Sequence, residues 1–153
     1  MAKHQQIIRR IRFAVIVSLV FSSSAHLAYA TGVEAKLTPQ QVSALNALID
    51  KQVTQPGDRE IIAGWTEAQR VAEFICRPAL QKEIRRQFPA ADKTILDQGT
   101  GNQHHLESPS LLTGNGQFRT GIEWTRFNYR CELTGSSGMV KKVHIVSLKQ
   151  LTP

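Results

Sequence analysis

The sequence predicts an α+β fold: two or three N-terminal helices packed on a small antiparallel β-meander, with one disulfide. Up to Phe88 the apolar residues recur at helical spacing. From Gly99 onward that period is lost, and apolar residues alternate with polar ones between glycine-marked turns. Helices followed by strands are typical of the α+β class.

The first predicted helix begins after Thr38. Thr38 can cap it, Pro39 suits the first helical position, and Gln41 completes a capping box. The segment QPGD, residues 55–58, predicts its end. One face of this helix is apolar: Val42, Leu45, Leu48, Ile49 and, as a rough extension, Val53.

A second helix is predicted from Thr66, where Gln69 again completes a capping box, to Cys76. Pro78 cannot donate to the preceding turn, so it breaks or kinks this helix. It can equally begin a third helix over residues 79–88, which Pro89 closes. The apolar faces of the two helices are Val71, Phe74 and Ile75, and then Leu80, Ile84 and Phe88.

Residues 122–133 form the clearest predicted strand. Ile122 and Trp124 fall out of phase with the later residues, which predicts a bulge near Thr125 and Arg126. Other strands are expected over residues 94–97, around 111–112 or 117–119, and over 139–148, with Asn115-Gly116 as a hairpin turn. The sheet would have three or four strands. One face of the clearest strand is apolar: Phe127, Tyr129, Cys131 and Leu133.

The N-terminus has the three parts of a secretory signal peptide. Residues 1–12 are basic without any acidic residue, residues 13–21 are apolar, and Ala28-Tyr29-Ala30 matches the small-residue cleavage site. We therefore expect 1–30 to be a cleaved signal peptide and 31–153 a single globular domain, with its core at about 64–148. The apolar run is well short of the about 20 residues that span a bilayer, so we expect no permanent membrane span.

Cleavage changes the charge of the protein. The full chain has 19 Lys and Arg against 12 Asp and Glu, but four of the basic residues lie in the first thirty. The mature chain would carry 15 against 12, a net charge of +3 rather than +7. Because the basic excess lies largely in the signal, we expect no nucleic-acid partner.

The two cysteines, Cys76 and Cys131, both lie in the mature part. In an oxidising compartment such a pair is most simply a disulfide. Two buried thiols or a redox pair are the alternatives, although no C-x-x-C motif is present. General secretion to the periplasm, or release from the cell, is the predicted localisation.

Two halves of the mature chain resemble a known family. The segments AEFICRPAL (72–80) and FPAAD (88–92), then LTGNGQ (112–117), GIEWTRFNYRCEL (121–133) and residues 138–143, are similar to the domain-of-unknown-function 930 family of exported alphaproteobacterial proteins. The resemblance covers roughly residues 64–146. It implies export and a bond between Cys76 and Cys131, and it assigns no activity, catalytic residue or ligand.

The candidate binding surface is a basic and aromatic group on the clearest strand: Trp124, Arg126 and Arg130. Arg119 lies nearby, and Lys82, Arg85 and Arg86 form a second basic group on the third helix. These cations could meet an anionic glycan or a lipid phosphate.

His104 and His105, with Glu107 and His144, are weak candidates for a metal site. Adjacent histidines on extended backbone point apart, and their segment is rich in Gly, Ser and Pro. We therefore expect a solvated loop there, and no cofactor. Glu123 and Glu132 are the candidate carboxylate pair for a glycosidase, which needs a separation of about 5 to 10 Å.

Three functions are compatible with these features. We favour a non-enzymatic accessory protein that binds an envelope protein or an anionic glycan, through a sheet edge or the basic and aromatic surface. A cell-wall or glycan hydrolase using His104, His105 or the paired glutamates is the alternative, and a secreted inhibitor of a host or competitor enzyme is the third. The sequence specifies neither the ligand nor the oligomeric state.

Overall fold

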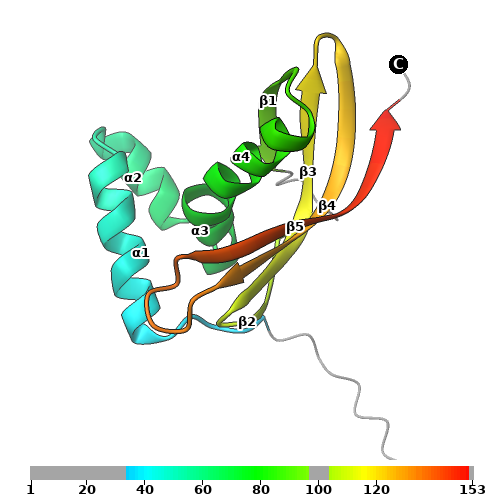
Figure 1. Cartoon of the computed structure of the whole chain (residues 1–153). Helices are drawn as coiled ribbons and strands as arrows, with labels where there is room; N and C mark the ends of the chain where they lie inside the picture. The colour runs from blue at the N-terminus through cyan, green and yellow to red at the C-terminus, as the bar shows by residue number, and fades with distance from the viewer. Residues whose placement is uncertain (1–33, 97–103, 152–153) are drawn as a thin grey trace, which may run out of the picture. The chain divides into compact units, whose positions relative to one another are not determined.

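Helices occupy the first half of the described chain and strands the second half, so the predicted α+β class is confirmed (Figure 1). The computed structural model describes residues 34–96 and 104–151, within the unit Gly32–Pro153. The predicted signal peptide and its cleavage site lie outside the described residues. The elements are α1 (Pro39–Gln52), α2 (Pro56–Ala63), α3 (Glu67–Val71), the π-helical turn η1 (Ala72–Cys76), α4 (Arg77–Gln87), β1 (Ala91–Leu96), β2 (His105–Ser108), β3 (Leu111–Thr120), β4 (Glu123–Leu133) and β5 (Val140–Leu151).

The strands form one antiparallel sheet in the order β1-β3-β4-β5. The short strand β2 pairs with the first residues of β3, and β1 pairs with its last residues. Two short strands therefore share one side of β3, whereas the long strand β5 lies at the opposite end of the sheet. The sheet has five strands within residues 34–96 and 104–151, so the expectation of three or four was too low. The extra strand is β2, which contains His105.

Both predicted capping boxes are confirmed. Thr38 accepts from the Gln41 N–H while the Gln41 side chain accepts from the Thr38 N–H, and Thr66 and Gln69 repeat the pattern. Gln41 does more than cap. Its side chain is buried and donates to the carbonyl oxygens of Pro109 and Thr134, at 2.8 and 3.1 Å. It thus ties the start of α1 to two loops of the sheet.

One helix was missed. The segment QPGD does end α1, but Pro56 takes an early position in the short helix α2 rather than a loop position. Proline fits the first turn of a helix because the amide hydrogens there have no helical partner. The residues 55–58 therefore follow the end of α1 and also contain the start of α2. Arg59 donates to the Val53 carbonyl oxygen at 2.8 Å and closes the α1–α2 hairpin.

The second and third predicted helices follow each other directly. Between them, η1 widens the turn just before Pro78, which lies in the first turn of α4. Proline removes one helical hydrogen bond, and a π-helical turn is a common way to accommodate such a defect. Cys76, the last residue of η1, is fully buried and faces the sheet.

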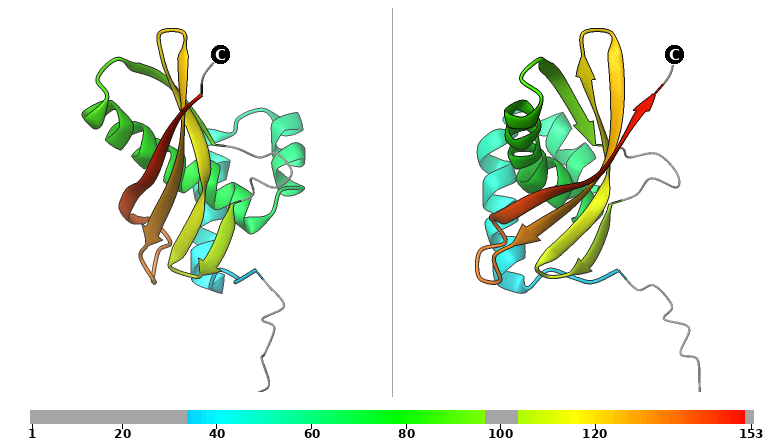
Figure 2. Two further views of the ribbon diagram at one scale, coloured as in Figure 1. Left: turned by 90° about the vertical axis from the view of Figure 1, so that its right-hand side faces the viewer. Right: turned by 45° about the vertical axis from the view of Figure 1, so that its right-hand side comes forward.

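The disulfide joins η1 to β4, as the sequence predicted. The Cys76 and Cys131 sulfur atoms are 2.07 Å apart and their Cα atoms 6.0 Å apart. The helices lie over one face of the sheet (Figure 2), where Phe127, Tyr129 and Leu133 of β4 are buried against them. No helix among the described residues is long and apolar enough to cross a membrane.

Two local predictions in the sheet are wrong. Asn115 and Gly116 do not form a turn but lie inside β3; the turn between β3 and β4 is at Gly121 and Ile122, with Gly121 at φ 62°. No bulge occurs near Thr125, because β4 pairs with β3 in unbroken register from Glu123 to Glu132. Ile122 is out of phase because it belongs to the turn.

Candidate functional site

The face of the sheet opposite the helices carries the candidate binding surface. Alternation along β4 buries Phe127, Tyr129 and Cys131, so the intervening residues lie on the other face. None of the described helices covers that face (Figure 2). We call it the open face, and it comprises Thr113, Asn115, Gln117 and Arg119 of β3, Trp124, Arg126, Asn128, Arg130 and Glu132 of β4, and Lys142, His144 and Lys149 of β5.

The strand register brings polar side chains into rows across the open face. Arg126 is paired with Gln117 on β3 and with Lys149 on β5. In the next row Asn128 is opposite Asn115. Cross-strand partners have Cβ atoms about 4.5–5.5 Å apart, so each row places its amides and cations next to one another. The predicted cations therefore lie in a polar surface that extends beyond β4.

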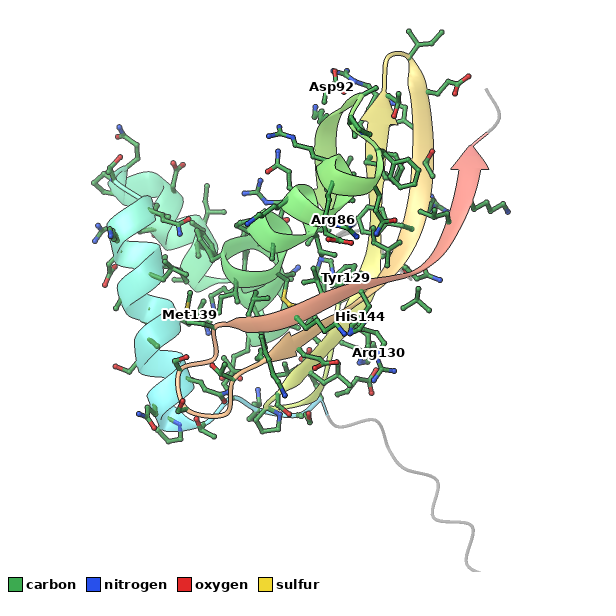
Figure 3. The ribbon with its side chains drawn as sticks, in the orientation of Figure 1. Arg86, Asp92, Tyr129, Arg130, Met139 and His144 are labelled. Carbon is green, nitrogen blue, oxygen red and sulfur yellow. A yellow bond between two sulfur atoms is a disulfide. The ribbon has the colours of Figure 1, made fainter. Side chains whose placement is uncertain are left out.

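A third row places Arg130 between Thr113 of β3 and His144 of β5; Figure 3 labels Arg130 and His144. Arg130 is exposed, and His144 Nε2 lies 3.2 Å from Glu132 Oε1. Over β4 and β5 the open face carries four cations and one carboxylate, a net charge of +3: Arg126, Arg130, Lys142 and Lys149 against Glu132. Cations paired within one row lie within the Debye length of about 8 Å at physiological salt. The rows of Arg126 and Glu132 are six residues apart on β4, about 20 Å, so the cations line an extended surface rather than a single anion site.

Trp124 is the second residue of β4, next to the turn of the β3–β4 hairpin. This hairpin projects beyond the helices (Figure 1). The Trp124 ring is partly exposed, and the Arg119 guanidinium carbon lies 5.9 Å from the ring centroid. Arg119 in turn donates two hydrogen bonds to Asp92 of β1, at 3.0 and 2.7 Å, and this pairing lowers the pKa of the Asp92 carboxyl. The salt bridge fixes the guanidinium, and the guanidinium supports the indole ring.

The two candidate metal ligands are separated by the sheet. His104 is buried and its Nδ1 lies 2.9 Å from the hydroxyl oxygen of Tyr129, whereas His105 begins β2 and is exposed. The expectation of a solvated loop was therefore wrong for His104, because a contact 25 residues away in sequence buries it. Burial also raises the pKa of Tyr129, and the carboxylate of Glu73 adds to that effect. No group of three metal-ligating side chains occurs among residues 34–96 and 104–151.

The carboxylate pair proposed for a glycosidase is not assembled. Glu123 and Glu132 are nine residues apart on one continuous strand, which corresponds to about 30 Å at about 3.4 Å per residue. A glycosidase pair needs about 5 to 10 Å. The two residues therefore cannot flank one glycosidic bond.

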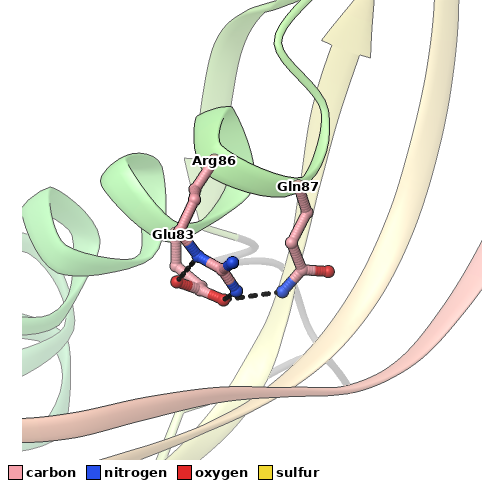
Figure 4. Close-up of polar contacts among 3 residues, drawn as sticks. All are labelled: Glu83, Arg86 and Gln87. Atoms are coloured by element: carbon pink, nitrogen blue, oxygen red, sulfur yellow. Dashed lines mark hydrogen bonds and ion pairs between the residues drawn. The ribbon is translucent and has the colours of Figure 1, made fainter.

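The second basic group, on α4, is partly neutralised. Glu83 accepts from the Arg86 guanidinium at 2.9 and 2.6 Å and from the Gln87 amide at 2.7 Å (Figure 4). These hydrogen bonds lower the pKa of Glu83 to about 2. Glu83 therefore stays ionised and paired with Arg86 near neutral pH.

A pocket of about 340 Å³ between α1 and α2 was not predicted. Its apolar walls include Val53, Ile61 and Trp65, and Asp58 lies among its polar residues. The sequence signal for it would have been the exposed Ile61, but that signal depends on recognising α2. Trp65 thus lines a surface pocket and also packs against Phe74.

No family model, no curated protein and no solved structure matches this chain. The resemblance to the domain-of-unknown-function 930 family therefore stays a prediction. The disulfide that it implies is present, but the same bond was expected from the two cysteines alone.

Proposed function

We propose that this is an exported, non-enzymatic accessory protein of the bacterial envelope that binds an anionic glycan through the open face. The observation that carries the proposal is the combination of cations, amides and one aromatic ring on one side of the sheet. A continuous flat surface without a helix above it accommodates an extended polymer.

Each residue type on the open face has a partner in an acidic polysaccharide. Arg130 can donate two parallel hydrogen bonds to a uronate carboxylate. The exposed side-chain amide of Asn128 offers both donors and an acceptor, which sugar hydroxyls require. The Trp124 ring, supported by Arg119, offers an apolar face with an N–H at its edge, which suits the face of a sugar ring.

Export is supported by two independent features. The three-part N-terminus is typical of a signal peptide, and the buried disulfide is typical of proteins that mature in an oxidising compartment. Envelope polysaccharides are abundant in that compartment. The favoured ligand class and the favoured localisation therefore agree.

The experiment measures binding of polygalacturonate, with neutral dextran as the control ligand, to the protein purified after export. Arg130→Glu with Lys149→Glu changes two exposed cations of the open face. Lys82→Glu with Arg85→Glu makes the same change in net charge on α4 and is the matched control.

We expect the open-face double variant to lose affinity by about tenfold or more, which is about 1.4 kcal/mol. The α4 variant should stay within about twofold, since charge away from the site acts only through screened solvent. Trp124→Ala should weaken binding without changing its dependence on salt. Equal losses in both double variants would contradict the proposal, because they would mean that net charge alone attracts the polymer.

A further inference from the structure

The strand β5 is the long edge strand of the described sheet. It has 12 residues and pairs with β4 alone among the described strands. The opposite end of the sheet is made of the two short strands β1 and β2, and the Ala35 N–H donates to the Leu106 carbonyl oxygen of β2 at 3.0 Å. Short or covered edges resist pairing with other chains, whereas a long edge invites it.

Apolar side chains are exposed along this edge. Of the six large apolar residues exposed in the described chain, three belong to β5 or precede it: Met139 at 44%, Val146 at 59% and Leu148 at 47%. Val146 lies at the register shift between β4 and β5, which leaves it without a partner residue on β4. Exposed apolar residues on an unpaired edge are typical of a surface that another strand covers.

The positive charge of β5 determines which partner strand can pair with it. Residues 140–151 contain three lysines, at positions 141, 142 and 149, and no acidic residue. If two copies paired antiparallel about the middle of β5, Lys149 of one copy would lie opposite Lys142 of the other. Like charges directly opposite destabilise a strand pair. A second copy is therefore a poor partner, and an acidic strand is a good one.

The surroundings of β5 add to the positive charge. The helix α4 lies beside β5 (Figure 4) and carries the exposed Lys82 and Arg85. The one carboxylate of α4, Glu83, is already bonded to Arg86 and Gln87. The neighbouring helix thus adds exposed cations to those of β5.

We propose that β5 binds an extended acidic segment of a protein partner by strand addition, with acidic residues opposite the lysines and apolar residues toward Val146 and Leu148. This site shares Lys142 and Lys149 with the open face, but it uses the main-chain edge of β5, which the glycan site does not use. Main-chain hydrogen bonds would supply affinity, and the alternating side chains would supply selectivity.

The test uses a fluorescein-labelled peptide of about nine alternating Glu and Val residues, about the length that β5 can pair with. A second peptide of the same sequence is N-methylated at two adjacent central residues. It keeps its charge but loses one donor on each edge. Binding is followed by fluorescence anisotropy, and the site is located by amide hydrogen exchange.

We expect the unmodified peptide to bind and to slow amide exchange in β5. The N-methylated peptide should bind with at least about tenfold lower affinity. Lys141→Glu should weaken binding, whereas Lys51→Glu, which makes the same charge change on α1, should not. Arg130→Glu on the open face should have little effect, which separates this site from the glycan site.

Three results would overturn the proposal. Equal binding of both peptides would mean charge attraction without strand pairing. Slowed exchange outside β5 would place the site elsewhere. A dimer of the protein alone in sedimentation equilibrium, abolished by Val146→Lys, would show that a second copy covers the edge.

Discussion

The contribution of the disulfide can be predicted in magnitude. It joins residues 55 apart in sequence, and both cysteine side chains are completely buried. On the chain-entropy model, closing a loop of this length destabilises the unfolded chain by about 4 kcal/mol. Replacing both cysteines, in Cys76→Ala with Cys131→Ala, should lower the free energy of unfolding by about that amount, with a further loss for the missing sulfur contacts.

The assay is urea unfolding of the disulfide-bonded protein, followed by far-ultraviolet circular dichroism. The midpoint should fall, the slope should rise because the unlinked chain exposes more surface, and the melting temperature should drop by about 15 °C. Wild-type protein unfolded with a reductant present is the control, because it loses the link but keeps the sulfur atoms. An unchanged midpoint and slope in the double variant would show that the disulfide does not contribute to stability as expected.

Three more predictions follow from single contacts. Gly114→Ala would place a methyl group 2.9 Å from the Tyr129 hydroxyl and should lower the free energy of unfolding, measured in urea, by about 2 kcal/mol. The control is Gly57→Ala in α2, where nothing lies within 4 Å of the new methyl group, and it should be neutral or stabilising. Because the pKa of Tyr129 is raised in the folded protein, above pH 10 this phenol ionises in the unfolded state but not in the folded state. The free energy of unfolding should therefore fall by about 1.4 kcal/mol per pH unit above pH 10. Tyr129→Phe should remove this contribution to the pH dependence. Arg119→Gln should return the pKa of Asp92 toward its ordinary value, measured by carboxyl NMR titration, and an unchanged value would show that the salt bridge is not formed in solution.

The features predicted correctly from the sequence are those that a few neighbouring residues determine. A capping box needs only Thr38 and Gln41, and both hydrogen bonds of the box are present. The buried face of β4 could be predicted from the alternation of apolar and polar residues alone, because one face of that strand contacts the helices and the other does not. The disulfide could be predicted because the chain contains only two cysteines, Cys76 and Cys131.

The features that were missed depend on contacts between distant segments. Asn115-Gly116 looks like a hairpin turn, but Gly116 is needed for packing. A Cβ atom there would lie 2.6 Å from the Phe127 ring and 2.8 Å from the Ile95 carbonyl oxygen. In the same way, nothing near His104 in sequence indicates that Tyr129 buries it. A glycine or histidine signal has several physical causes, and only the assembled sheet distinguishes them.

The candidate binding surface was predicted in part. Trp124, Arg126 and Arg130 alternate on one strand, so their common face could be inferred. The contributions of Lys142 and Lys149 could not be inferred, because they depend on the register between β4 and β5. That register includes two irregular positions, which sequence periodicity does not locate.

The most direct test of the open face as a glycan-binding surface is an NMR titration of the disulfide-bonded protein with a short oligogalacturonate. We expect shift changes at the Trp124 indole and at the side chains of Arg126 and Arg130, with none at the buried Tyr129. Changes confined to the α1–α2 pocket, or none at concentrations of oligogalacturonate well above about 1 mM, would contradict it.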